Sequence, residues 1–193
     1  MDVAEQILQA TRRAFGRRGL QALSMRGIAK EVGITPMAIY RHYENKQALV
    51  DALVLDALDE WSRLVAAIPP AAPLDWLRKL GEAHLDFALR KPRRYEAAFL
   101  IQSSKARRYP HDFIAGKSPA GALQLKLIAE LISLGVLRNV TPIEIIISNA
   151  ALSQGLITLY RAGRIAGCES EFRELYMRTT ERSFSSFLVG GHE

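Results

Sequence analysis

The segment from Leu23 to Leu49 constrains the fold more than any other part of the sequence. Ser24 is a residue type that caps helices, and Thr35-Pro36 pairs a second cap with a proline at the first helical position, where its missing N–H does no harm. Between them, Gly33 can adopt the positive φ that a tight turn requires. The segment therefore predicts two short helices, about 24–32 and 36–42, joined as a helix-turn-helix.

Helix signals dominate the rest of the chain as well. No stretch alternates polar and apolar residues for long enough to indicate a strand. The clearest breaker is the Pro- and Ala-rich run Ile68–Pro73, and two later helices begin at Ser118-Pro119 and Thr141-Pro142. We predict an all-α protein of about nine helices, the others being 3–18, 46–68, 74–90, 92–104, 119–137, 142–162 and 170–189, with a loop over 105–117.

Composition limits the classes of protein to which the chain can belong. It is 49% hydrophobic and 24% charged, as in ordinary globular proteins. Its one cysteine, Cys168, allows no intramolecular disulfide and has no resolving partner for a redox switch. We find no secretory leader and no apolar run of about 20 residues, so we expect a cytoplasmic protein with no membrane span. His and Cys residues are too scattered for a metal site, and we expect no cofactor and no catalytic centre.

A more specific pattern lies within the helix-turn-helix. The chain supplies Ile28-Ala29, Gly33-Ile34, Tyr40-Arg41-His42-Tyr43 and Asn45-Lys46 in that order. Over about residues 4–53 this pattern resembles the N-terminal domain of TetR-family transcriptional regulators. The resemblance implies a three-helix DNA-binding domain over 1–45 and a larger helical ligand-binding and dimerisation domain over 46–193. The helix 46–68 would connect the two.

The resemblance also implies which residues meet DNA. Thr35, Tyr40 and Lys46 match family positions that contact backbone phosphates. Tyr43 is better interpreted as a core residue, whereas His42 is equally consistent with a cap, a core histidine or a DNA contact. The full set of expected DNA-binding residues is Ser24, Arg26, Thr35, Pro36, Met37, Ala38, Tyr40, Arg41, His42 and Lys46.

The charge distribution agrees with an anionic partner for the first quarter of the chain. The net charge is +6, and residues 1–50 contain eight basic and four acidic side chains. A basic N-terminal domain favours phosphate binding. A second basic group, between Arg90 and Arg108, is interpreted as a solvated face.

The remaining expectations concern the larger domain. By resemblance it encloses a ligand cavity, for which the candidates are Trp61, His84, Phe87, Phe99, Tyr109 and Gln154, although core packing explains each of these residues as well. The helix 142–162 is apolar on more than one side, which favours packing both inside the subunit and against a partner. The expected homodimer interface contains Ile143, Ile147, Ala151, Phe184 and Phe187.

These observations predict a homodimeric regulator that binds a palindromic operator, acts as a repressor, and is released by a small apolar or aromatic effector. Two alternatives remain at this point. One is a small-molecule-binding or enzymatic helical protein with a vestigial helix-turn-helix. The other is an architectural DNA-binding protein without a ligand.

Overall fold

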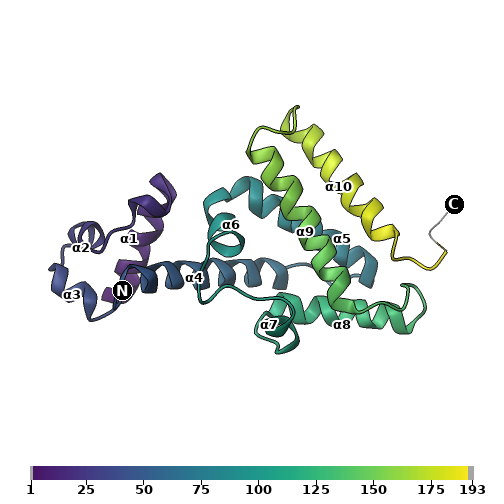
Figure 1. Ribbon diagram of the computed structural model, residues 1–193, viewed down its shortest axis with the longest axis horizontal. Helices are drawn as coiled ribbons and strands as arrows, with labels where there is room; N and C mark the ends of the chain where they lie inside the picture. The colour runs from purple at the N-terminus through teal and green to yellow at the C-terminus, as the bar shows by residue number, and fades with distance from the viewer. Residues whose placement is uncertain (1, 191–193) are drawn as a thin grey trace. The chain divides into compact units, whose positions relative to one another are not determined.

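A computed structural model describes residues 2–190. The described residues form ten α-helices and one 3₁₀ helix (Figure 1). No strand occurs among them, and a single isolated β-bridge joins Leu137 to Leu188. The all-α prediction is therefore confirmed. The helices are α1 (Val3–Arg18), α2 (Met25–Val32), α3 (Pro36–Tyr40), α4 (Lys46–Ala66), α5 (Pro73–Arg90), α6 (Pro92–Phe99), α7 (His111–Ile114), α8 (Pro119–Ser133), α9 (Pro142–Arg161) and α10 (Glu169–Ser185), with η1 at Leu20–Ala22.

The chain divides into two compact units. Unit 1 comprises residues 1–61 and 91–106, and unit 2 comprises residues 62–90 and 107–193. The chain therefore passes from one unit to the other three times, after Trp61, after Arg90 and after Ala106. This division differs from the boundary expected at 45/46, because most of α4 and all of α6 group with the N-terminal helices. The boundary between a DNA-binding domain and a ligand-binding domain stays a prediction.

Unit 1 is built around the helix-turn-helix. Its core side chains come from the first four helices and from α6, and Phe15, Ile28, Ile39 and Leu53 are each at most 1% exposed. These residues recur at helical spacing because each helix must bury one apolar face against the others. The packing fixes α3 against α2 and α2 against α1.

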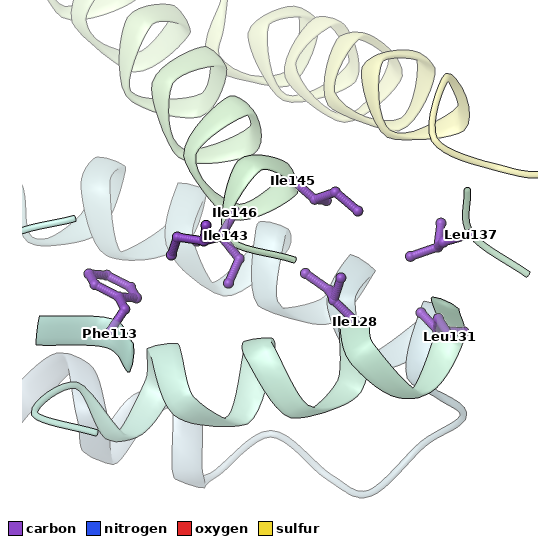
Figure 2. Packing of buried hydrophobic residues seen from close by; sticks show 7 residues of the cluster. All are labelled: Phe113, Ile128, Leu131, Leu137, Ile143, Ile145 and Ile146. Atoms are coloured by element: carbon purple, nitrogen blue, oxygen red, sulfur yellow. The ribbon is translucent and has the colours of Figure 1, made fainter. Parts of the chain in front are cut away.

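Unit 2 contains an apolar cluster at the meeting of α7, α8 and α9. Figure 2 shows Ile128 of α8 pointing toward Ile143 and Ile146 of α9, with Phe113 of α7 on the other side of these two residues and Leu131 of α8 close to Leu137. Leu137 and Ile145 complete the buried set, and Phe184 and Phe187 pack against it half-buried. Ile143 is only 9% exposed, so little of its side chain is left for the partner subunit to which we had assigned it.

Several sequence predictions of helix extent differ from the structure, and the predicted helix 92–104 ends at Phe99. The short helix α7 lies within the stretch expected to be a loop. α8 ends at Ser133 because Gly135 takes a φ of +70°, and α10 ends at Ser185, so both helices are shorter than predicted. The residues that follow them pair instead, with Arg138 N–H donating to Phe187 O at 2.8 Å and Val189 N–H to Val136 O at 3.0 Å.

Candidate nucleic-acid interface

Side-chain caps fix the ends of the three helices that form the candidate interface. Ser24 Oγ accepts from Gly27 N–H at 3.1 Å, and Thr35 Oγ1 accepts from Ala38 N–H at 3.1 Å. Asn45 Oδ1 accepts from Ala48 N–H at 2.9 Å at the start of α4. A hydroxyl that accepts a cap bond keeps its own hydrogen, so Ser24 and Thr35 can still donate to a phosphate.

Gly33 makes the turn between α2 and α3. Its φ of +80° and ψ of +25° lie in the left-handed region, and its N–H closes α2. A side chain at this position would strain the backbone even though nothing lies within 4 Å of a Cβ built there. The turn therefore requires the residue that the sequence supplies.

The expected DNA-binding residues lie on the outside of unit 1. Met37 is 72% exposed and Tyr40 47% exposed, although large apolar side chains are usually covered. Ala38 is half-buried, and the other expected contacts are exposed: Ser24, Arg26, Thr35, Pro36, Arg41, His42 and Lys46. Tyr43 is half-buried with its hydroxyl 3.5 Å from Ala4 O, and burial is the main cause of its raised pKa. This agrees with its interpretation as a packing residue.

Ion pairs divide the basic residues of this region into two groups. Glu31 accepts from Arg13 at 2.8 Å and from Arg17 at 3.1 Å, and these bonds hold the pKa of its carboxyl below the ordinary value. Arg12 forms an ion pair with Asp56. Within residues 2–190, no carboxylate pairs with the remaining cations, Arg18, Arg26, Lys30, Arg41 and Lys46. The charge available to an anion is therefore concentrated around α2, α3 and the start of α4.

The six expected ligand-binding residues are distributed over both units. In unit 1, Trp61 and Phe99 form an edge-to-face pair with ring centroids 5.6 Å apart. In unit 2, His84 Nδ1 lies 3.3 Å from the hydroxyl of Tyr176, and Tyr109 stacks on Phe113 with centroids 4.1 Å apart. The other two residues of unit 2 are Phe87, which is buried, and Gln154, which is half-buried.

Other features of the described residues bear on chemistry. Between residues 2 and 190, no group of three or more His, Cys, Asp or Glu side chains could hold a metal ion. The helix α9 is long and apolar enough to cross a membrane, judged by length and composition alone. Of its most apolar 18-residue stretch, 17% is buried within this chain. Sequence reasoning did not recognise this helix as a possible span.

Together, the capped two-helix unit, its exposed front and its unpaired cations define a helix-turn-helix DNA-binding domain. The sequence model of bacterial regulatory proteins of the tetR family matches residues 7–53. Residues 7–53 of this chain are thus similar to the N-terminal domain of tetR-family regulators.

Relatives of known name match part of the chain. The chain is 40% identical over 79 residues to the HTH-type transcriptional regulator TtgR of Pseudomonas putida, which is 39% of this chain and 37% of that protein. It is 34% identical over 55 residues to the HTH-type transcriptional repressor KstR2 of Mycolicibacterium smegmatis, 28% of this chain and 27% of that one. The chain thus matches 37% and 27% of the length of these two relatives.

Similarity to solved structures extends over nearly the whole chain. A protein of unknown function from Rhodococcus sp. RHA1 aligns with a TM-score of 0.75 at 20% identity, covering 98% of this chain and 97% of that one. A TetR-family transcriptional regulator from Haemophilus influenzae aligns with a TM-score of 0.68 at 19% identity, covering 97% of both chains. At this identity the similarity establishes the fold of the larger domain and nothing about its ligand.

Proposed function

We propose that the protein is a transcriptional regulator that binds operator DNA through α3 and its flanking residues. The observation that carries the proposal is the exposed front of α3, where Met37 and Tyr40 are exposed in the same unit as five cations that pair with no carboxylate among residues 2–190. Met37 offers apolar contact to thymine methyls, and Arg41 can reach a guanine edge. Tyr40, Thr35 and Lys46 would hold the phosphates that set the register of the helix.

The protein would bind as a homodimer through α9 and α10. On α9, the exposed positions from Ile147 to Leu159 carry no charge, and these two side chains are 39% and 47% exposed. An uncharged, largely apolar exposed face of this length is typical of a subunit interface as well as of a membrane span. A symmetric dimer would present two copies of α3, which supports a palindromic operator with half-sites about 34 Å apart.

Unit 2 offers groups suited to an apolar effector. Burial lowers the pKa of His84 to about 4, so its imidazole is neutral at pH 7. Burial also raises the pKa of Tyr176 to about 12, so its hydroxyl is neutral as well. His84 is only half-buried, which leaves part of its side chain accessible to a ligand. A neutral hydrogen-bonding pair surrounded by apolar and aromatic side chains is how proteins orient a small uncharged ligand. His84, Phe87, Tyr109 and Gln154 are therefore the contacts proposed within this unit.

Release from DNA would follow from differential affinity. α4 begins at Lys46 and runs unbroken past Trp61, about 22 Å further along at 1.5 Å per residue. A tilt of this helix would change the separation of the two recognition helices in a dimer. An effector that favours the tilted state weakens DNA binding by the same factor by which DNA weakens effector binding. KstR2 is named a transcriptional repressor, which supports repression rather than activation for this protein.

Selection of DNA from a random duplex library by the purified protein tests this function. We expect enrichment of one palindromic motif, and loss of enrichment for a Thr35→Ala, Lys46→Ala double variant that still melts cooperatively. A library that stays unenriched, beside a protein that still binds small apolar molecules, would favour a ligand-binding protein with a vestigial helix-turn-helix. A single non-palindromic half-site would exclude the symmetric dimer on DNA.

A further inference from the structure

Five charged side chains of unit 1 form one connected cluster, which we call the α1–α4–α6 charge cluster. Four lie on helices, namely Arg12 of α1, Asp56 and Glu60 of α4 and Arg94 of α6, and the fifth is Lys91, which precedes α6. Arg12 donates to both oxygens of Asp56, one of these bonds being Nε to Oδ2 at 2.7 Å. Arg94 forms an ion pair with Asp56, its Nη1 lying 2.5 Å from Oδ2, and its Nη2 donates to the backbone carbonyl of Asp56 at 2.9 Å. Asp56 therefore connects α1 to α6.

Glu60, one turn further along α4, strengthens the second half of this connection. Its two oxygens accept from Lys91 at 2.7 Å and from Arg94 at 2.5 Å. Within the described part of the chain, Asp56 alone contacts cations of both α1 and α6, since Glu60 contacts only the two residues at the α6 end.

The cluster is partly shielded from water. The side chains of Asp56, Arg94 and Glu60 are 12%, 20% and 20% exposed. Burial would raise the pKa of the Asp56 carboxyl, but hydrogen bonds from Arg12 and Arg94 outweigh burial and leave the pKa lowered. Charges at this depth are screened less than surface pairs, and removing one partner leaves the others uncompensated.

The connections of the chain between the two units make this cluster relevant to coupling as well as to stability. The segment 91–106 belongs to unit 1, but the residues directly before and after it, Arg90 and Arg107, belong to unit 2. α6 is thus covalently tied to unit 2 at both ends while its side chains are fastened to α1 and α4. Arg93 also lies over the ring of Phe15 at 5.9 Å, and Ser103 and Ser104 donate to Asp51 of α4 at 2.7 and 2.6 Å.

We propose that Asp56 is a positioning residue that makes α6 a second link to the DNA-binding helices, in addition to α4. A displacement of either end of the segment 91–106 is passed through Arg94 and Asp56 to Arg12, and so to the helix against which α2 packs. Because linkage is reciprocal, DNA held by α2 and α3 restrains α6 through the same contacts. This inference rests on the proposed function, because it concerns what DNA binding does to α6.

Hydrogen exchange of the full chain, with and without DNA, tests the link. The probe is a 30-base-pair duplex enriched from the random library by the wild-type protein. We expect this duplex to slow exchange in peptides that cover α2 and α3, by direct contact, and also in peptides that cover α6. In Asp56→Asn the first effect remains and the second falls by at least half.

Three further variants separate coupling from general destabilisation. Arg94→Gln keeps the Asp56–Arg12 pair and removes the α6 side, and it reproduces the loss even if Asp56→Asn folds poorly. The double variant loses no more than either single variant, because both act on one contact. Asp112→Asn is the matched control: this carboxylate of unit 2 is 10% exposed, pairs with Lys117 at 2.9 Å, and its loss leaves both effects in place.

The outcomes are distinct. If no duplex slows exchange in α2 and α3, the proposed function fails and the link falls with it. If α2 and α3 respond but α6 does not respond in the wild type, the link alone is overturned. The link is overturned equally if α6 responds to the same extent in Asp56→Asn and Arg94→Gln as in the wild type.

Discussion

Lys46 provides the sharpest test of how this protein binds DNA. It is the first residue of α4, it is exposed, and no carboxylate pairs with it among residues 2–190. Each phosphate that a cation neutralises contributes about 0.9 to the slope of log affinity against log salt. Since the proposed dimer carries two copies, Lys46→Ala should flatten the slope by about 1.8.

That slope converts into a difference that is easy to measure. Between about 50 and 200 mM salt, a slope change of 1.8 corresponds to about 12-fold in relative affinity. The variant therefore loses about 12-fold less affinity than the wild type over this range. Fluorescence anisotropy with a labelled operator duplex, at four or more salt concentrations, measures both slopes, and the loss should be nearly the same for unrelated duplexes.

Arg13→Ala is the matched control, because Arg13 is also basic and its side chain is 52% exposed. Its guanidinium donates to Glu31 at 2.8 Å, so we expect its removal to leave the slope unchanged, with Arg17 still neutralising Glu31. Equal slopes for Lys46→Ala and the wild type would remove Lys46 from the phosphate contacts. A flattened slope in Arg13→Ala would refute the division of the cations by ion pairing.

Three further predictions concern stability and assembly. Gly33→Ala should lower the free energy of unfolding by about 1 kcal/mol, because alanine is strained at a φ of +80°, whereas Gly16→Ala within α1 should raise it by about 0.5–1 kcal/mol. Urea unfolding of both variants measures the contrast, and a Gly33→Ala protein as stable as the wild type would contradict the prediction. Ile147→Glu should give folded monomers in sedimentation velocity with greatly weakened operator binding, whereas Ile143→Glu, at a site 9% exposed, should unfold the chain; a dimeric Ile147→Glu protein would place the interface elsewhere. The pKa values of Asp56 and Glu60 are lowered because hydrogen bonds from cations outweigh burial, so the contribution of both carboxylates to stability is complete above their unfolded-state pKa values of about 4 and is lost as pH falls through their lower folded-state pKa values. The loss of stability at acid pH should therefore be less steep in an Asp56→Asn, Glu60→Gln double variant, and an unchanged steepness would exclude the cluster as its source.

The sequence was sufficient for features whose cause is local. Ser24 and Thr35 cap helices with bonds to residues three positions away, and Gly33 makes a turn that depends on its own φ. Such contacts depend on short spacings, which a sequence displays directly. The DNA-facing residues of α3 were expected from the resemblance to TetR-family regulators, and Met37, Tyr40 and Arg41 are exposed in the structure.

Features that depend on distant pairing were not predicted. The spacing of Asp56 and Glu60 places two acids on one face of a helix, and Lys91 and Arg94 form a comparable basic pair, but nothing local indicates that the two meet or that Arg12 joins them. The bridge between Leu137 and Leu188 likewise joins segments that the helical pattern had extended. The short α7 was missed because four residues are too few to show a period.

The threefold crossing of the chain between the units determines what can be exchanged in a hybrid regulator. A fragment that ends at Trp61 would carry Asp56 and Glu60 without Arg94 or Lys91, leaving two shielded carboxylates short of cations. A chimera that joins such a fragment to a foreign sensor inherits whatever side chains the foreign segment supplies opposite α4. The part that transfers intact is therefore discontinuous, residues 1–61 together with 91–106, and the sensor must be inserted at two places in the sequence rather than appended at one.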